Sequence, residues 1–164
     1  MKKIIKYSFF GLIYLFIVFI LAIIFLKEAD AEIIKPNNGI EPYQVVKIVL
    51  RGLKNNDIPK KDNGIEQTWE FAHPNNQKFT GPLNRFIDML KGQSYRMLLN
   101  HIDHKIIEVQ LTNSIASYEV TVLDINKKYY KFNWQVEKYR KDGPLKGCWL
   151  TTMVSAPIIL GSSI

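Results

Sequence analysis

The pattern of hydrophobic positions divides the chain into an apolar leader and a longer patterned region. Residues 7–26 contain no charged side chain and consist mainly of Ile, Leu, Phe and Val. At about 1.5 Å of rise per residue, a helix of this length spans roughly 30 Å, the thickness of the hydrocarbon core of a bilayer. We therefore expect residues 7–26 to cross the membrane lipid bilayer as a helix.

The charges around this segment predict its orientation. Lys2, Lys3 and Lys6 precede it and only Lys27 follows closely, so the positive-inside rule places the N-terminus in the cytoplasm and the rest of the chain outside. Residues 29–31 (Ala-Asp-Ala) have the spacing of a signal-peptidase site, which makes residues 1–31 either a retained anchor or a cleaved signal sequence. The apolar run exceeds the about 7–15 residues typical of signal sequences, and this favours the anchor.

After an expected tether over residues 32–41, three stretches show helical spacing. Pro42 begins the first, and its apolar positions are Val45, Val46, Val49, Leu50 and Leu53. Asp62 is the expected N-cap of a second helix that runs through Phe71, and residues 75–78 are expected to be loop. The third starts at Pro82 and ends at Gly92, with one apolar stripe at Leu83, Phe86, Ile87 and Leu90.

Further along, the hydrophobic period changes from helical spacing to alternation. Apolar and polar residues alternate over residues 107–111, 118–122 and 130–136, and a more mixed strand covers 148–154. Helices followed by an antiparallel meander predict an α+β fold, with two or three helices on one face of a curved sheet of about four strands. Such a domain, residues 42–155, would resemble the cone of nuclear-transport-factor-2-like folds, followed by a flexible tail at 156–164.

Charge and cysteine content narrow the function classes. The 164-residue chain has a net charge of +7, of which 18 − 13 = +5 belongs to residues 32–164. Export makes nucleic acid a poor partner, so the basic residues between 127 and 146 are read as a solvated strand edge or a contact with anionic lipid. The single cysteine, Cys148, excludes an internal disulfide and a cysteine-based zinc site, and we expect a buried, inert thiol.

Five blocks of the patterned region resemble a known family. They are residues 53–66 (LKNNDIPKKDNGIE), 71–74 (FAHP), 80–86 (TGPLNRF), 95–101 (YRMLLNH) and 147–151 (GCWLT). Together they are similar to the bacterial and plant family known as domain of unknown function 4864, over roughly residues 43–155. That family has no assigned activity, so the resemblance implies no catalytic residue or cofactor. Many of its members carry an acidic residue where this chain has Thr152.

The polar positions shared with that family are the candidate ligand-binding residues. They are Asp57, Asp62, Glu66, Arg85, Tyr95, Arg96 and His101, together with Asn56. Asp57, Asp62 and Glu66 suit either acid–base chemistry in a pocket or, as we favour, local roles as helix caps. Arg85 lies among apolar helix positions, where an arginine needs a carboxylate, so we expect it to pair with Asp62 or Glu66.

The sequence predicts no metal site and no cofactor. If the strand extended through them, alternation would place His101 and His104 on opposite faces, and no third ligand follows from the sequence. We expect one of these histidines to be hydrogen-bonded in the fold and the other to be solvated. We therefore expect a membrane-anchored extracytoplasmic module that binds a small ligand or an envelope protein without catalysis. The alternatives are a small pocket enzyme that uses Asp57, Asp62 or His101 for acid–base chemistry, and a secreted form produced by cleavage near Ala31.

Overall fold

The computed structural model describes residues 32–162, and the predicted membrane segment at residues 7–26 lies outside this range. Residues Ile33–Ile164 form a compact unit of their own. Within the part of the chain that the structure describes, no helix has the length and apolar character needed to cross a membrane.

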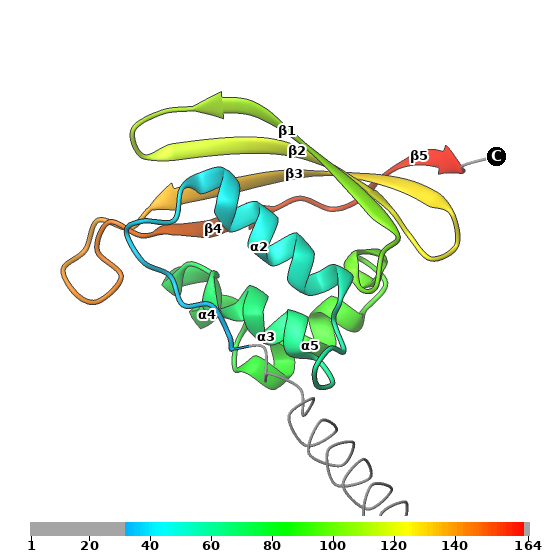
Figure 1. Ribbon diagram of the computed structural model, residues 1–164, viewed down its shortest axis with the longest axis horizontal. Helices are drawn as coiled ribbons and strands as arrows, with labels where there is room; N and C mark the ends of the chain where they lie inside the picture. Colours follow the sequence, from blue (N-terminus) through cyan, green and yellow to red (C-terminus); the bar gives the residue numbers. More distant parts are fainter. Residues whose placement is uncertain (1–31, 163–164) are drawn as a thin grey trace, which may run out of the picture. The chain divides into compact units, whose positions relative to one another are not determined.

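The unit combines four α-helices with a five-stranded antiparallel sheet, which confirms the predicted α+β class (Figure 1). The helices are α2 (Pro42–Lys54), α3 (Asn63–Glu70), α4 (Pro74–Thr80) and α5 (Leu83–Lys91), followed by a 3-10 turn, η1 (Arg96–Leu98). The strands are β1 (Asp103–Leu111), β2 (Ile115–Leu123), β3 (Lys128–Lys138), β4 (Trp149–Val154) and β5 (Ile158–Ser162). β1, β2 and β3 pair in order, and β4 and β5 pair with successive parts of β3.

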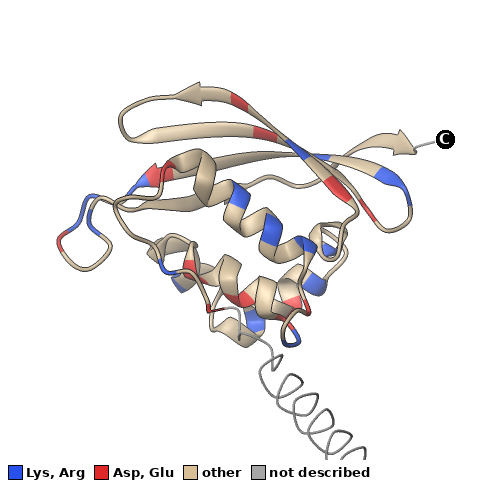
Figure 2. Cartoon of the chain, in the orientation of Figure 1, with Lys and Arg blue, Asp and Glu red and all other residues tan. Residues whose placement is uncertain are grey.

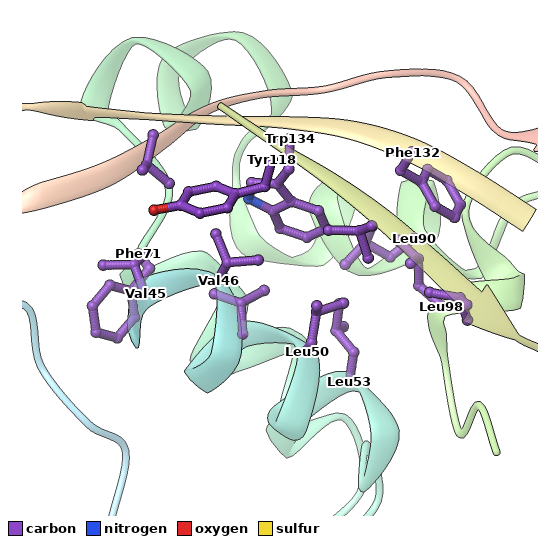
Figure 3. Packing of buried hydrophobic residues seen from close by; sticks show 14 of the residues in the cluster. Val45, Val46, Leu50, Leu53, Phe71, Leu90, Leu98, Tyr118, Phe132 and Trp134 are labelled. Carbon is purple, nitrogen blue, oxygen red and sulfur yellow. The ribbon is translucent and has the colours of Figure 1, made fainter. Parts of the chain in front are cut away.

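Helix α2 packs its apolar stripe on the sheet, as the sequence predicts. The five apolar residues of the stripe are completely buried, and Figure 3 shows the side chains of Val46 and Leu50 directed toward Tyr118 and Trp134 of the sheet. Full burial of one such aliphatic side chain contributes about 1.5–3 kcal/mol. At its C-terminal half, α2 meets α3 so closely that a Cβ atom at Gly64 would overlap the carbonyl group of Gly52.

Helix α4 occupies the stretch that was expected to be loop, so that expectation is wrong. Pro74 lies in its first turn, and the His73 ring nitrogen Nδ1 accepts a hydrogen bond from the backbone N–H of Asn75. None of its residues is buried, and therefore no hydrophobic period marks the helix in the sequence.

Strand β1 leaves its alternating apolar residues exposed. The register places Ile106 opposite the buried Val120, so that Ile107 lies on the other face opposite Glu119. Ile107, Val109 and Leu111 are all exposed, although the bulge between Glu108 and Gln110 brings Leu111 opposite the buried Ala116, so the alternation here does not mark a core-facing set. Alternation predicts two faces for a strand, but only the pairing with β2 decides which of them is covered.

Residues near both ends of the unit form hydrogen bonds with its helices or strands. Strand β5 lies within the expected flexible tail and pairs with Lys128–Lys131 of β3, so the expectation of a tail is wrong there. All residues of β5 are exposed, and its pairing rests on main-chain hydrogen bonds that leave no hydrophobic pattern. The expected tether has no helix or strand, but the Gln67 side chain forms two 2.8 Å hydrogen bonds with the backbone of Ile34.

Candidate functional site

Two of the predicted carboxylates meet at the connection between α2 and α3. The Asn56 amide donates to Asp57 Oδ1 at 3.0 Å and to Asp62 Oδ1 at 3.4 Å. Asn100 Nδ2 donates to Asp57 Oδ2 at 3.0 Å, and Lys91 Nζ lies 2.7 Å from Asp62 Oδ2. Both carboxylates are therefore used to join this connection to α5 and to the segment before β1.

These bonds weaken Asp57 as a base. The hydrogen bond from Asn100, followed by that from the backbone N–H of Asp62, holds the pKa of the Asp57 carboxyl below its usual value. A general base near neutral pH needs a raised pKa, so this environment suits a structural carboxylate better than a catalytic one.

Asp62 precedes α3 but does not cap it with its side chain, which corrects the sequence prediction. Its backbone is left-handed, with φ at 63°, and its side chain makes no bond to an N–H group of the helix. The side chain of Asn56 caps the start of α3 instead, because its Oδ1 accepts a hydrogen bond from the backbone N–H of Ile65 at 3.1 Å. Its own carbonyl accepts from Gly64 N at 2.9 Å.

Glu66 and Arg85 do not meet. Glu66 pairs with Lys60 at 2.7 Å, and Asp62 is already paired with Lys91. Arg85 is exposed on α5 and forms no ion pair within residues 32–162. The predicted pairing of Arg85 with Asp62 or Glu66 is therefore wrong, since lysines closer in space hold both carboxylates.

The two histidines of the candidate cluster face each other, contrary to the prediction. His101 Nε2 lies 2.7 Å from His104 Nδ1, and His101 Nδ1 lies 2.7 Å from the carbonyl oxygen of Leu98. A carbonyl only accepts, so His101 carries its proton on Nδ1 and accepts from His104 on Nε2. Asn100 has a left-handed backbone (φ 52°) and strand β1 begins only at Asp103, so strand alternation does not apply across this pair.

His101 is held neutral inside the fold. It is 2% exposed, and burial lowers its pKa to about 4. Among the residues that the structure describes, no three His, Cys, Asp or Glu side chains are grouped so as to hold a metal ion. The pair is thus part of the core polar structure.

An apolar cavity lies between the helices and the sheet, with a volume of about 490 Å³. Helices α2 to α5, the 3-10 turn and strands β3 and β4 all contribute to its wall, and its apolar contributors include Phe79, Phe86, Met89, Leu98, Trp134 and Val154. No aspartate, glutamate, lysine, arginine, histidine or cysteine lines it. Of the seven candidate residues, Tyr95 alone does so.

The polar groups in the wall of this cavity bond to one another. Trp134 Nε1 donates to Thr151 Oγ1 at 3.3 Å, and the Asn76 amide donates to the carbonyl oxygens of Thr151 at 3.1 Å and Thr152 at 2.9 Å. The Thr80 hydroxyl donates to the backbone carbonyl oxygen of Asn76 at 2.7 Å. The cavity therefore offers its occupant mostly hydrocarbon, with Phe79 exposed at 84%.

A second, more polar hollow of about 800 Å³ lies between the 3-10 turn, the β2–β3 turn and β5. Arg96, another candidate residue, lines it together with Lys128. The basic residues between 127 and 146 do not form one surface, because those of the β2–β3 turn and those of the β3–β4 loop lie at opposite ends of β3 (Figure 2).

Comparison of the chain with protein-family models, with curated proteins and with solved structures found no match. The resemblance to the domain of unknown function 4864 therefore stays a prediction. Sequence reasoning allowed for a pocket in its alternative of a small pocket enzyme, but it missed the lining residues because they come from seven elements. One clue was Phe79, a large apolar residue in an otherwise polar stretch.

Proposed function

We propose that this unit is a non-catalytic module that binds a small apolar ligand, and that residues 7–26 hold it outside the cytoplasmic membrane. The observation that supports the ligand is the cavity of about 490 Å³, whose wall combines aromatic, Leu and Met side chains with satisfied polar groups. Cavities of this size and composition are typical of small-molecule sites. The uncharged 20-residue leader supports the location, with secretion after cleavage as the alternative.

The finer fold assignment is part of the same proposal. An open cavity between the helices and one face of an antiparallel sheet is the feature that supports a nuclear-transport-factor-2-like cone. The sequence blocks between residues 53 and 101 and the block at 147–151 support membership in the domain of unknown function 4864.

The three candidate bases of the enzyme alternative are all engaged with other groups of the protein. Asp57 and Asp62 are bonded within the α2–α3 connection, and both ring nitrogens of His101 have protein partners. None of the three lines the apolar cavity. An acid–base reaction needs such a group within reach of the bound molecule, so binding without catalysis is the better supported function.

A neutral fluorescent probe tests this proposal. The 33–164 unit contains the whole described core, and we expect it to bind N-phenyl-naphthylamine with enhanced probe emission. Phe79→Ser removes an exposed aromatic side chain of the cavity wall and is expected to weaken binding about tenfold, with stability changed by less than about 0.5 kcal/mol.

Ile58→Ser is the matched control. Ile58 is 68% exposed and lies outside the cavity lining, so its removal is expected to leave probe affinity unchanged. Absence of probe binding to the wild-type unit, or equal losses in the two variants, would contradict the proposal.

A further inference from the structure

The polar hollow beside the apolar cavity carries positive charge that the protein itself does not neutralise. Arg96 and Lys128 both line the hollow, are exposed, and take part in no ion pair within residues 32–162. A guanidinium group presents a planar fork of donors that matches a carboxylate or phosphate group. The basic residues of the β2–β3 turn lie at this end of the sheet, next to β5 (Figure 2).

The carboxylate in the lining of the hollow, Asp124, accepts hydrogen bonds from its own β2–β3 turn. Asp124 is 5% exposed, and its Oδ1 accepts from the backbone N–H groups of Asn126 at 2.9 Å and Lys128 at 2.8 Å. Its Oδ2 lies 3.4 Å from the Asn126 amide. The Asp124 oxygens therefore hold the β2–β3 turn, while the side chains of Arg96 and Lys128 remain available to an external anion.

The polar hollow and the apolar cavity are neighbours on the two sides of one short segment. Tyr95 lines the apolar cavity and the next residue, Arg96, lines the polar hollow. On β3, Trp134 belongs to the cavity and Tyr130 to the hollow, about 13 Å apart at the usual rise of a strand. Val154, the last residue of β4, lines the cavity, and Pro157, between β4 and β5, lines the hollow.

We infer that the ligand is an anionic single-chain amphiphile whose carboxylate or phosphate head contacts Arg96 and Lys128 while its hydrocarbon chain lies in the apolar cavity. This inference rests on the proposed function and names the chemical class of its ligand. A neutral apolar molecule would make no ionic contact with Arg96 and Lys128. A free anion would make no contact with the apolar wall of the cavity. An amphiphile matches the charge of one site and the hydrocarbon wall of the other.

Titration of the 33–164 unit with a matched set of probes tests this assignment. Dodecyl phosphate shares its chain with dodecanol and its head group with inorganic phosphate. Dodecyl phosphate is used below its critical micelle concentration and dodecanol below its solubility limit. Dodecyl phosphate is expected to bind about tenfold more tightly than dodecanol, and the difference should shrink as salt is added. Inorganic phosphate alone is expected to bind far more weakly than either.

Charge-removing variants locate the head group. Arg96→Gln and Lys128→Gln are each expected to weaken dodecyl phosphate about three- to fivefold, as for exposed charge pairs, and to leave dodecanol unchanged. Arg85→Gln and Lys105→Gln are the matched controls, because both residues are exposed and line neither the hollow nor the cavity. They are expected to change neither affinity.

The outcomes separate this inference from the proposed function. If dodecanol and dodecyl phosphate bind equally well, or if the controls weaken binding as much as Arg96→Gln and Lys128→Gln, the anionic head group is wrong and the apolar site stands. If inorganic phosphate binds as tightly as dodecyl phosphate, the hollow is a free-anion site and the amphiphile is wrong. If neither chain binds, the proposed function itself is overturned.

Discussion

At the scale of single residues, the buried amide of Asn56 joins the start of α3 to the end of α2. Its side chain is 2% exposed, and its Oδ1 accepts from Ile65 N. Asn56→Ala leaves that N–H group buried without a partner, so we expect the free energy of unfolding to fall by about 2 kcal/mol, measured by urea denaturation of the 33–164 unit.

The neighbouring residue provides the control for this prediction. Asn55 is exposed and its amide bonds only to the carbonyl of Arg51. Asn55→Ala is expected to change the free energy of unfolding by less than about 0.5 kcal/mol. Similar losses in the two variants would show that Asn56 has no special structural role.

The buried ring of His101 predicts the direction of the pH dependence. Its pKa is about 4 in the folded unit against the ordinary value of 6.5, so between these values the unfolded chain binds more protons. The stability that the neutral ring contributes is complete above pH 6.5 and is lost as the pH falls toward about 4, by roughly 3 kcal/mol in total.

Urea denaturation over this pH range measures the effect. His101→Asn keeps a donor near the Leu98 carbonyl but does not titrate, so its free energy of unfolding should decline less steeply with falling pH. His104, whose pKa burial also lowers, accounts for part of the remaining decline. An unchanged slope in His101→Asn would contradict the assignment.

At the scale of elements, β5 illustrates a strand held by its backbone alone. It pairs with Lys128–Lys131 of β3 and buries none of its residues. Deletion of residues 158–164 is expected to cost only about 1–2 kcal/mol, because few main-chain hydrogen bonds and no core contacts are lost.

Amide hydrogen exchange checks this prediction within one molecule. Protection should decrease at those amides of residues 128–131 that face β5, whereas the amides that face β2 and residues 134–138, which pair with β4, remain protected. Fast exchange at 128–131 already in the undeleted unit would mean that β5 is not paired in solution.

At the scale of the whole molecule, the proposed location depends on the apolar leader. The uncharged residues 7–26 predict that the full chain remains in the membrane fraction after alkaline extraction, whereas the 33–164 unit does not. N-terminal sequencing of the mature protein should begin at or near Met1. A mature chain that begins near Glu32 would instead establish cleavage and a secreted form.

The candidate site was predictable only in its residue types. The resemblance selected Asp57 and Asp62, capping chemistry predicted local roles for them, and both do serve the α2–α3 connection. Their partners Asn100 and Lys91 lie 43 and 29 residues away along the chain, and no local pattern indicates them. Arg85 was assigned a carboxylate on the basis of its apolar neighbours, but it projects from the exposed side of α5.

The sequence by itself determined the elements whose information is local. The apolar stripe and Pro42 of α2 specify that helix, and alternation specifies β2 and β3, because their periods follow directly from backbone geometry. Only the tertiary structure decided which face of β1 is covered, what β5 pairs with, and that seven elements line one open apolar cavity. These features depend on contacts between residues far apart in sequence, where register and packing, rather than local preference, set the free energy.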